Sequence, residues 1–383
     1  MRIALVTNTL PPRGRGGAEA YVRDLGVGLA GNGHEVLVLS GAPGPVPGTQ
    51  VRTLPGLADL PRTAPYAVKL LWHARDQWLP SVHLAAKREF LRFEPDVVHT
   101  HECQGLSAAV FTAIDRLHIP HVHTAHDMNL LCARVSMTRD GQFCGGKCNL
   151  CLVQRRIRGG IIGRHLKRLI SVSEYIQRRH LEGGIVRPER ALVIRLGTAV
   201  AAARPRILPG NGITLGFIGA VALHKGVATV LAAIEAAPAD WRLTIAGDGP
   251  MVPEVEALSA RDSRIAFLGH IGGEDKERFF DSIDVLVVPS EWEEPAALVA
   301  TEAIARGIPT IVSDRGGIPE TPEARVFRSG SAAGLAAAVQ KYVDQPDEYV
   351  AVSQRLVARQ EEFSWEFHQA KVEAVLRAAV QEG

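Results

Sequence analysis

The chain has 383 residues, and because a single hydrophobic core stops growing at roughly 250–300 residues, two domains are expected. Its composition, 46% apolar and 22% charged, is ordinary for a soluble globular protein. The net charge of +2 excludes a strongly polyanion-binding protein. That sum conceals an asymmetry, since residues 1–198 hold 26 Lys and Arg against 15 Asp and Glu, whereas residues 199–383 hold 17 against 26.

The N-terminal apolar run, residues 3–7, is too short for a signal peptide and has no small-residue cleavage site after it. It is better interpreted as a buried first strand. No stretch of about 18 apolar residues occurs, so no membrane span is expected. The chain is predicted to be cytoplasmic, with at most a peripheral position on the inner face of the membrane.

Short apolar stretches alternate with helical patterns such as residues 18–32 and 84–93. The strands expected in the first half are residues 3–7, 35–40, 96–100, 121–124 and 168–172. Those expected in the second half are residues 213–218, 242–246, 264–267, 285–288 and 310–312. Apolar strands separated by helices are typical of parallel sheets covered on both faces, and two such series indicate two Rossmann-like domains.

Residues 197–212 contain small residues, Pro and Gly without an amphipathic period, and are interpreted as a linker. The domains are therefore expected at 1–198 and 199–364. Ligands of doubly wound sheets bind at the carboxyl ends of strands, so the active site is expected in the cleft between the domains.

The most informative segment spans residues 289–303, where a strand ends and a helix is expected to begin at Pro295. The amides at such a helix start favour a phosphate. They would belong to Ala296, Ala297 and Leu298. Glu294 in the loop and Glu302 in the second helical turn cannot attract phosphate, so they are interpreted as acceptors for the hydroxyl groups of a nucleotide-sugar.

This Glu-x7-Glu spacing occurs with further ordered motifs. They are Gly219 with Lys225-Gly226, the Ala-Gly-Asp-Gly-Pro of residues 246–250, the Phe-Leu-Gly of residues 267–269, and the Ser-Asp-Arg-Gly-Gly-Ile-Pro-Glu of residues 313–320. Together they resemble the retaining glycosyltransferases of family 4. The resemblance implies an α/β GT-B fold of two Rossmann-like, doubly wound domains with an interdomain cleft. The final helix, within residues 365–383, would complete the first domain.

The resemblance also assigns roles in the donor domain. It implies that Glu294 binds the transferred sugar and Glu302 the nucleotide ribose, while Lys225 neutralises the pyrophosphate. A fixed cation there stabilises the charge that grows on a departing nucleoside diphosphate. Residues implied near the donor are Gly219, Gly247, Gly249, His270 and Ile271; for the glycines, simple turn formation is the alternative.

The sequence departs from the family pattern in two places. Ala220 stands where an arginine is common, so one pyrophosphate charge is missing or comes from His224, Arg195 or Arg315. Ala296 and Ala297 stand where a glycine is frequent, which predicts a tighter sugar pocket.

In the first half, a glycine-rich loop with Gly16 and Gly17 follows the first strand and opens a helix. Its spacing is not that of a dinucleotide fingerprint, which argues against a dehydrogenase. In the resembled family this loop faces the donor phosphates and the acceptor; the alternative is a flexible surface loop.

Histidines cluster around two predicted strands. His126, which ends one of them, matches the family histidine that contacts the donor sugar, and we expect it to orient that sugar. His121 and His123 alternate on the strand and fit a core position or a metal site equally. His99 and His101 follow the preceding strand, with structural and functional interpretations both open.

Four of the five cysteines are closely spaced: Cys132, Cys144, Cys148 and Cys151. In a cytosolic chain this spacing is typical of metal binding, and four thiolates suit tetrahedral zinc. An iron–sulfur cluster and free or redox-paired thiols remain as alternatives. Cys103 is expected to be a separate buried thiol.

Eight basic residues crowd residues 155–179, with only Glu174 opposing them. They are Arg155, Arg156, Arg158, Arg164, Lys167, Arg168, Arg178 and Arg179. With Trp72 and Trp78 they could form a platform for an anionic or lipid-linked acceptor, or simply a solvated basic face. Nucleic acid is not expected as a partner, because aromatic residues are not interleaved at stacking density.

These observations favour a retaining glycosyltransferase that moves a sugar from a nucleotide-diphosphate donor, with a UDP- or GDP-sugar expected, to a glycan, lipid-linked or small-molecule acceptor. No Asp-x-Asp motif occupies a suitable position, so catalysis is expected to need no cofactor. The alternatives are a GT-B epimerase, a phosphorylase (which would hold pyridoxal phosphate), or a non-catalytic nucleotide-sugar or metal-binding protein.

Overall fold

The computed structural model describes residues 1–14, 16–57, 59–61, 63–139, 142–146, 148–199, 203–210 and 212–382, without the side chains of residues 139, 142, 163 and 164. The chain divides into two compact units, one formed by Met1–Arg195 with Gln369–Gly383 and the other by Leu196–His368. Of the predicted linker, residues 200–202 and 211 lie outside the described residues. Helix α13 (Trp365–Gln381) begins in the second unit and continues in the first.

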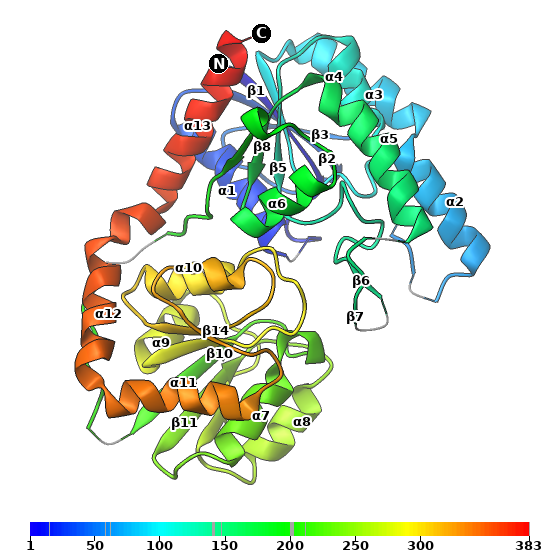
Figure 1. Cartoon of the computed structure of the whole chain (residues 1–383). Coiled ribbons are helices and arrows are strands. Elements are labelled where there is room, and N and C mark those ends of the chain that lie inside the picture. Colours follow the sequence, from blue (N-terminus) through cyan, green and yellow to red (C-terminus); the bar gives the residue numbers. More distant parts are fainter. Residues whose placement is uncertain are drawn as a thin grey trace. The chain divides into compact units, whose positions relative to one another are not determined.

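The first unit is built on a seven-stranded parallel sheet (Figure 1). Its strands, in spatial order, are β3 (Gln50–Thr53), β2 (Glu35–Ala42), β1 (Arg2–Thr9), β4 (Val97–Thr100), β5 (His121–Ala125), β8 (Leu166–Ser171) and β9 (Ala191–Val193). Residues 3–6 of β1 are fully buried. A strand that is apolar on both faces occupies the middle of a covered sheet, as the N-terminal run predicted.

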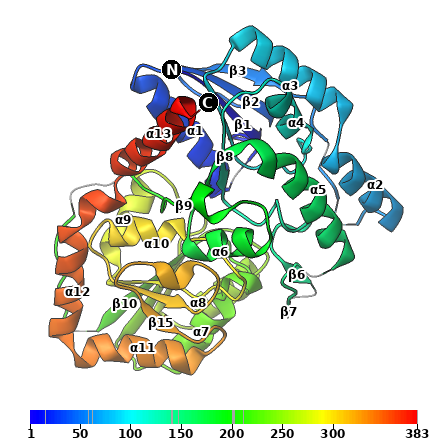
Figure 2. The same cartoon turned by 45° about the horizontal axis from the view of Figure 1, so that its top comes forward.

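Helices cover both faces of this sheet (Figures 1 and 2). They are α1 (Gly17–Gly31), α2 (Tyr66–Gln77), α3 (Pro80–Phe93), α4 (Ala109–Arg116), α5 (Asn149–His165), α6 (Glu174–Glu182) and the later part of α13. Between β5 and α5 lies a small antiparallel hairpin of β6 (Thr138–Arg139) and β7 (Gln142–Phe143). Glu373 of α13 pairs with His34, with Oε1 and Nε2 3.0 Å apart, which fastens the last helix beside the end of α1.

The second unit has a six-stranded parallel sheet. Its order is β12 (Ile265–Phe267), β11 (Trp241–Ala246), β10 (Ile213–Ile218), β13 (Val285–Val288), β14 (Thr310–Ser313) and β15 (Arg325–Phe327). The helices are α7 (Val227–Glu235), α8 (Val252–Ser259), α9 (Glu274–Ser282), α10 (Leu298–Ile304), α11 (Ala332–Asp344) and α12 (Pro346–Ala358).

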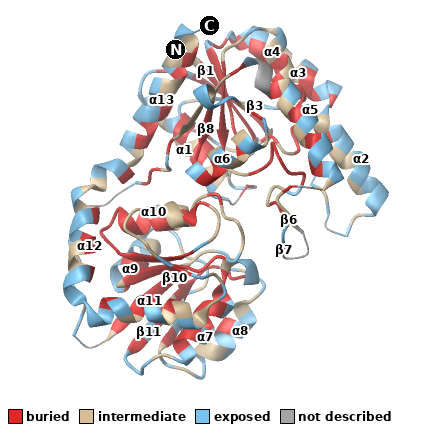
Figure 3. Cartoon of the chain, viewed as in Figure 1, coloured by how far each residue is buried: buried red, intermediate tan, exposed pale blue. Residues whose placement is uncertain are grey.

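Alternate residues of the second sheet enter two separate cores. Val285 and Val287 of β13 pack in the core that includes α7 and α11, whereas Leu286 and Val288 pack with α9 and α10. Figure 3 shows the result, with buried strands between helices that are exposed on their outer faces. The near-continuous apolar pattern of these strands follows from burial on both sides.

The predicted strands all occur, and β10 and β13 have the predicted bounds. Five strands were missed: the hairpin strands β6 and β7, and three strands of the parallel sheets, β3, β9 and β15. Each of the last three lies at a sheet edge and is at most half-buried apart from Phe327, so burial imposes little apolar pattern on it. Within the described residues, no helix is both long enough and apolar enough to cross a bilayer.

Candidate active site

Each sheet has one place where the order of strands reverses, between β1 and β4 in the first unit and between β10 and β13 in the second. At such a switch point the loops from neighbouring strands diverge, which opens a ligand site at the carboxyl edge. The predicted site residues of both units follow these strands and their neighbours. The topology therefore brings together residues that are 69 positions apart in the second unit, Lys225 and Glu294.

In the second unit, Lys225 and Glu294 meet at the switch point. Lys225 ends the short turn after β10, Glu294 lies in the loop after β13, and Nζ is 2.7 Å from Glu294 Oε1. The Ser290 hydroxyl donates to the other carboxylate oxygen at 2.5 Å. Lys225 also lies over the Trp292 ring, 5.4 Å from its centroid. The pair is thus held in place by its own loops, with both side chains mostly buried.

Glycines let the loops of this site approach one another closely. A Cβ on Gly247 would lie 1.8 Å from the carbonyl oxygen of Gly219, and one on Gly249 would lie 2.4 Å from that of Val221. The φ angles of Gly219, Gly247 and Gly249 are +156°, +142° and +156°. The positive φ angles of all three and the close approaches at Gly247 and Gly249 favour glycine at these turns, and their contact with the donor stays a prediction.

The stretch after β12 completes the same edge. Gly269 accepts the Gly247 N–H at 2.7 Å through its carbonyl, and His270 and Ile271 follow it. His270 is exposed, whereas Ile271 packs partly against the core beside α9 and α10.

Glu302 has a partner that the sequence did not reveal. Lys276 of α9 lies 2.6 Å from Glu302 Oε1, while Glu302 Oε2 is buried and makes no hydrogen bond. A buried carboxylate oxygen without a donor is costly, so this atom is suited to accept a ligand hydroxyl. Lys276 was missed because a lysine in the charged helix 274–282 looks like any solvated residue.

The predicted start of the helix after β13 is wrong by three residues. Helix α10 begins at Leu298 with Ala297 as its N-cap, so Ala296 and Ala297 precede it and Pro295 is outside its first turn. The loop is held away from helical geometry because the Glu294 carbonyl accepts the Gly317 N–H at 2.8 Å. Only Leu298, of the three residues proposed to offer helix amides, lies in the helix.

The candidates for the missing arginine are partly engaged elsewhere. Arg315 lies 3.5 Å from Glu293, and the His224 ring packs edge-on against Trp292. Arg195 belongs to the first unit, where it pairs with Glu174 at 3.2 Å. With alanine at position 220, Lys225 is the one of the predicted cations that the structure places next to Glu294.

In the first unit, the glycine-rich loop is closed over Glu19 of α1. The Thr9 hydroxyl donates to Glu19 Oε1 at 3.3 Å, and a Cβ on Gly16 would lie 2.4 Å from Glu19 Oε2. Gly16 is the N-cap of α1 and Gly17 its first residue. The loop therefore has a defined contact with α1 in addition to its predicted place after β1.

His126 lies directly after β5, beside the end of β4. Its Nε2 is 3.2 Å from Nδ1 of His101, and its ring makes an edge contact with Tyr21 of α1, centroid to centroid 4.7 Å. These contacts orient a half-buried imidazole at the carboxyl edge of the sheet. His101 and Tyr21 were not assigned a role in positioning it from sequence.

The other histidines that the sequence analysis singled out near these two strands, His99, His121 and His123, are buried. His99 bonds Thr124 at 2.7 Å, and the Thr100 hydroxyl lies 2.7 Å from His121 and 2.8 Å from His123. Burial lowers the pKa of His121 to about 3 and that of His123 well below its usual value. Burial and the contacts with Thr100 favour the core interpretation of His121 and His123.

Two carboxyl groups share the edge with His126. Glu102 and Asp127 hydrogen-bond each other, and Asp127 Oδ1 accepts the Asn129 N–H at 2.7 Å. Burial raises the pKa of Asp127 to about 6 and, together with Asp127 and Glu19, raises that of Glu102 well above its usual value. Raised pKa values are expected here, because a proton shared between Glu102 and Asp127 avoids two like charges buried side by side.

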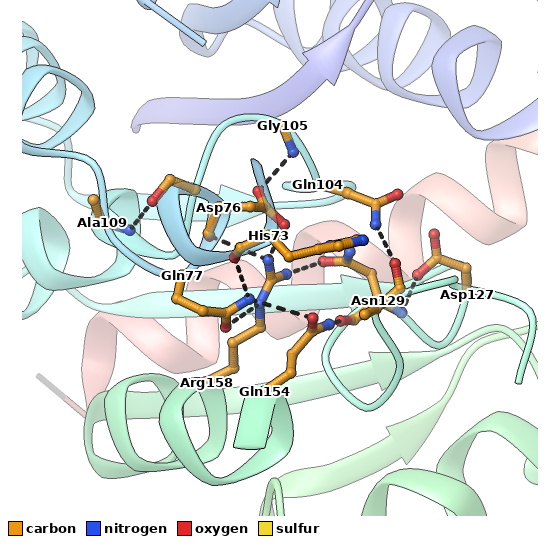
Figure 4. Close-up of polar contacts among 12 residues, drawn as sticks. His73, Asp76, Gln77, Gln104, Gly105, Ala109, Asp127, Asn129, Gln154 and Arg158 are labelled. Carbon is orange, nitrogen blue, oxygen red and sulfur yellow. Dashed lines mark hydrogen bonds and ion pairs between the residues drawn. The ribbon is translucent and has the colours of Figure 1, made fainter. Parts of the chain in front are cut away.

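Behind this edge lies a buried polar network (Figure 4). Arg158 of α5 is fully buried, donates to Asp76 Oδ2 of α2 at 2.5 Å, and donates to Asn129 Oδ1 at 2.5 Å. Gln154 donates to the Asn129 carbonyl at 2.6 Å. The network therefore holds the loop that follows His126 from the side of α2 and α5.

This finding corrects the place of one member of the basic group predicted from sequence. Arg158 is not on the surface, and Arg168 and Arg179 pair with Glu382 and Glu182. The side chain of Arg164 lies outside the described residues. Arg155, Arg156, Lys167 and Arg178 are the other members, and of these Arg156 and Arg178 are exposed.

The four clustered cysteines lie between this loop and α5. Cys151 Sγ is 3.2 Å from Cys148 Sγ and 3.5 Å from Cys132 Sγ, whereas the Cys144 thiol donates to the Met137 carbonyl at 3.1 Å. Cys103 is buried and separate from these contacts.

Two Rossmann-like units, each with candidate site residues at its switch point, are typical of a GT-B fold, and comparisons with known proteins agree. A model of glycosyltransferase family 4 matches residues 15–201, and a model of group 1 glycosyl transferases matches residues 212–345. The chain belongs to the group 1, family 4-type glycosyltransferases and is a glycosyltransferase.

Relatives and solved structures extend along the whole chain. The glycogen synthase of Mycobacterium tuberculosis is 29% identical, covering 96% of this chain and 92% of its own, and the MMP α-(1→4)-mannosyltransferase of Mycolicibacterium hassiacum is 26% identical, covering 99% and 98%. Anabaena HepE, solved with UDP, has the same fold with a TM-score of 0.75, 18% identity and coverage of 99% and 100%. HepE has also been solved with UDP-glucose.

Proposed function

We propose that this glycosyltransferase takes its sugar from a nucleoside-diphosphate donor and transfers it with retention of anomeric configuration. The observation that carries the proposal is the Lys225–Glu294 pair at the switch point between β10 and β13. An ammonium and a carboxylate at one ligand site are suited to a substrate that has a diphosphate next to a polyhydroxylated sugar. HepE, which shares the fold, was solved with UDP and with UDP-glucose.

The proposed chemistry assigns separate tasks to the two residues. As the bond from the anomeric carbon to the phosphate oxygen breaks, negative charge grows on the leaving diphosphate, and Lys225 stabilises it more than the ground state. Glu294 accepts hydroxyl hydrogens of the transferred sugar, and Oε2 of Glu302 accepts those of the ribose. The acceptor hydroxyl attacks from the face that the diphosphate leaves, and the leaving phosphate oxygen takes its proton.

His126 is the proposed contribution of the first unit. Its ring is oriented by His101 and Tyr21, so it can hydrogen-bond a sugar hydroxyl without an adjustment of its own. It is a positioning group in this scheme and forms no covalent bond. Since no residue is assigned to hold a catalytic ion, turnover is proposed to need no added Mg²⁺ or Mn²⁺.

A thermal-shift screen of UDP-, GDP-, ADP- and dTDP-sugars tests the proposal and identifies the donor. One class of nucleotide-sugar is expected to raise the melting temperature, and the product of its turnover should keep the anomeric configuration, as read by NMR of the new linkage. Inversion, or stabilisation by pyridoxal phosphate in place of any nucleotide-sugar, contradicts the proposal. Unchanged turnover in both Lys225→Ala and Glu294→Ala contradicts the residue assignment.

We also propose that the acceptor side of the first unit contacts an anionic lipid surface on the cytoplasmic face of a membrane, where a lipid-linked acceptor would be reached. Helices α2 and α5 expose apolar side chains: Tyr66, Val68, Leu70, Leu71, Leu150, Leu152, Val153 and Ile157. The acidic residue that these two helices contain, Asp76, is buried against Arg158, while Arg75 and Arg156 are exposed. Apolar side chains beside cations and without exposed acids suit an anionic bilayer.

Co-sedimentation with vesicles tests this surface. The protein is expected to bind phosphatidylglycerol vesicles and not phosphatidylcholine ones, and Leu70→Glu/Leu71→Glu should abolish binding. Leu84→Glu on α3 is the control, since Leu84 is 65% exposed and Leu70 and Leu71 are 50% and 60% exposed. Equal binding by all three proteins, or none to either lipid, contradicts the surface while leaving the donor proposal unaffected.

A further inference from the structure

Three thiol groups of the first unit lie in direct contact, although they come from two separate segments. Cys132 belongs to the loop after β5, whereas Cys148 is the N-cap of α5 and Cys151 lies in its first turn. The sulfur of Cys151 touches the other two, at 3.2 and 3.5 Å. Cys132 and Cys151 are only 1% and 2% exposed. The fold thus gathers sulfur atoms in a place that solvent barely reaches.

A backbone amide donates to one of these sulfurs. The Arg134 N–H donates to Cys132 Sγ at 3.3 Å, and the Val135 N–H donates to the Cys132 carbonyl at 3.0 Å. An amide donor to sulfur stabilises a thiolate, which is the form that binds metals. The turn that follows Cys132 therefore supplies part of a second layer around its sulfur.

Cys144 does not touch these three sulfurs in the structure and is hydrogen-bonded to Met137 instead. Its thiol and its amide both donate to the Met137 carbonyl, at 3.1 and 2.8 Å. Gly145 and Gly146, with φ angles of +61° and +69°, then turn the chain back toward Cys148. A rotation about the Cα–Cβ bond of Cys144 would direct its sulfur away from the carbonyl.

We propose that Cys132, Cys148 and Cys151 bind a zinc ion, with Cys144 as the fourth ligand. With a Zn–S distance of about 2.3 Å, tetrahedral geometry places neighbouring sulfurs about 3.8 Å apart. The sulfurs touch at slightly shorter distances, and among the described residues no three potential ligands surround a metal position. The cluster would therefore have to open by a few tenths of an ångström as the ion binds.

The distances also discriminate between the chemistries that the spacing left open. In a [4Fe–4S] cluster each cysteine binds a different iron atom, so the sulfurs would lie much farther apart than those of Cys148 and Cys151. A disulfide would use two of the three sulfurs and would leave the third as a separate thiol. A single ion uses all of them, and soft thiolate ligands select zinc among the common divalent ions.

The ion would act on the active site through one loop. Cys132 ends the segment that starts at His126, and Arg158 and Gln154 of α5 already hold Asn129 in its middle (Figure 4). Zinc would join the end of that segment to the first turn of the same helix. It is therefore a structural ion, and its role is to fix the loop rather than to take part in sugar transfer.

Metal analysis of the full-length protein tests the proposal. The protein is purified with a reductant that protects its thiols from oxidation. We expect about one zinc ion per chain, the ratio for a single four-ligand site. Cys132→Ser and Cys151→Ser should lose the ion, and Cys144→Ser should weaken its retention against a chelator. Cys103→Ser is the matched control, because Cys103 is equally buried and outside the cluster, so it should keep zinc as the wild type does.

Cobalt(II) reconstitution of the wild-type protein decides the matter even if a variant fails to fold. Two kinds of absorption band are expected: thiolate-to-cobalt charge-transfer bands in the near ultraviolet and intense d–d bands in the visible. Together they mark a tetrahedral thiolate site. The proposal is overturned if the protein neither contains nor takes up zinc, if Cys151→Ser retains it, or if mass spectrometry shows a disulfide among these cysteines in the protected preparation. Each of these outcomes leaves the glycosyltransferase proposal standing, because its test depends on Lys225 and Glu294.

Discussion

The carboxyl edges of the two sheets have the same topology but differ in their charge: one holds paired charges and the other holds mostly neutral polar groups. In the second unit, Lys225 and Lys276 pair with Glu294 and Glu302, so the edge holds fixed charges in compensated pairs. In the first unit, the edge holds imidazoles whose pKa is lowered by burial and a carboxyl pair whose pKa is raised, as at His101 and Asp127. The switch point thus decides where a site lies, whereas the local solvation decides whether it holds charges or neutral donors and acceptors.

The largest predicted effect is that acid destabilises the first unit. This unit contains four buried histidines whose pKa is lowered: His101, His121, His123 and His180. The unfolded chain binds protons near pH 6.5 and the folded one does not. Stability is therefore complete above that pH and falls below it, by about 1.4 kcal/mol per pH unit for each histidine. The carboxyl pair at Glu102 and Asp127 offsets part of this loss between about pH 6 and 4.

Hydrogen exchange followed from pH 7.5 to 5 measures the difference between the units. Amides of β4 and β5 should lose protection before those of β10 and β13, since no strand of the second sheet contains a histidine. Simultaneous loss in both sheets would show that the buried histidines do not set the acid stability.

Breaking the buried ion pair should have the next largest effect. Arg158→Met leaves Asp76 charged and buried, which is expected to cost about 3–5 kcal/mol in the free energy of unfolding, measured by urea denaturation. The double variant Arg158→Met/Asp76→Leu should recover much of that loss. Arg178→Ala, an exposed arginine of α6, is the control and should change stability little. A small effect of Arg158→Met would mean that the network in Figure 4 does not hold the loop.

The charge pair of the second unit should matter for catalysis more than for folding. Lys225→Ala is expected to lower kcat by about 100- to 1,000-fold, because it removes the cation that stabilises the leaving diphosphate. Steady-state rates with the donor found by thermal shift provide the measurement. Arg278→Ala, which removes an exposed arginine of α9, should leave kcat unchanged. An equal loss in both variants would point to damage of the fold instead.

The smallest predicted effect concerns the loop that carries Lys225. Gly226→Ala puts a side chain at a φ of +74°, with its Cβ 1.9 Å from the Pro289 carbonyl oxygen, and should cost about 1–3 kcal/mol. Gly272→Ala, where a Cβ meets no atom within 4 Å, should be close to neutral. Chemical denaturation of both variants compares them directly, and equal stability would show that the loop yields without cost.

The sequence predicted the fold through the residues that burial constrains. The bounds of β10 and β13 could be predicted because these strands are covered on both faces and must be apolar throughout. The motifs around Lys225, Glu294 and His126 could be placed at the carboxyl edge because each follows such a strand. The start of α10 could not, since Glu294 is held by Gly317, which lies 23 residues further along the chain.

By itself the sequence determined the two parallel sheets and the residues at their edges, because hydrophobic periodicity and strand ends are local properties of the chain. Only the tertiary structure decided which charges are paired. It buries Arg158 against Asp76, gives Glu302 a partner in Lys276, and brings Cys132 to Cys151. Each of these contacts joins segments that are distant in sequence, and the burial that shifts a pKa or makes a charge pair strong exists only once those segments have packed together.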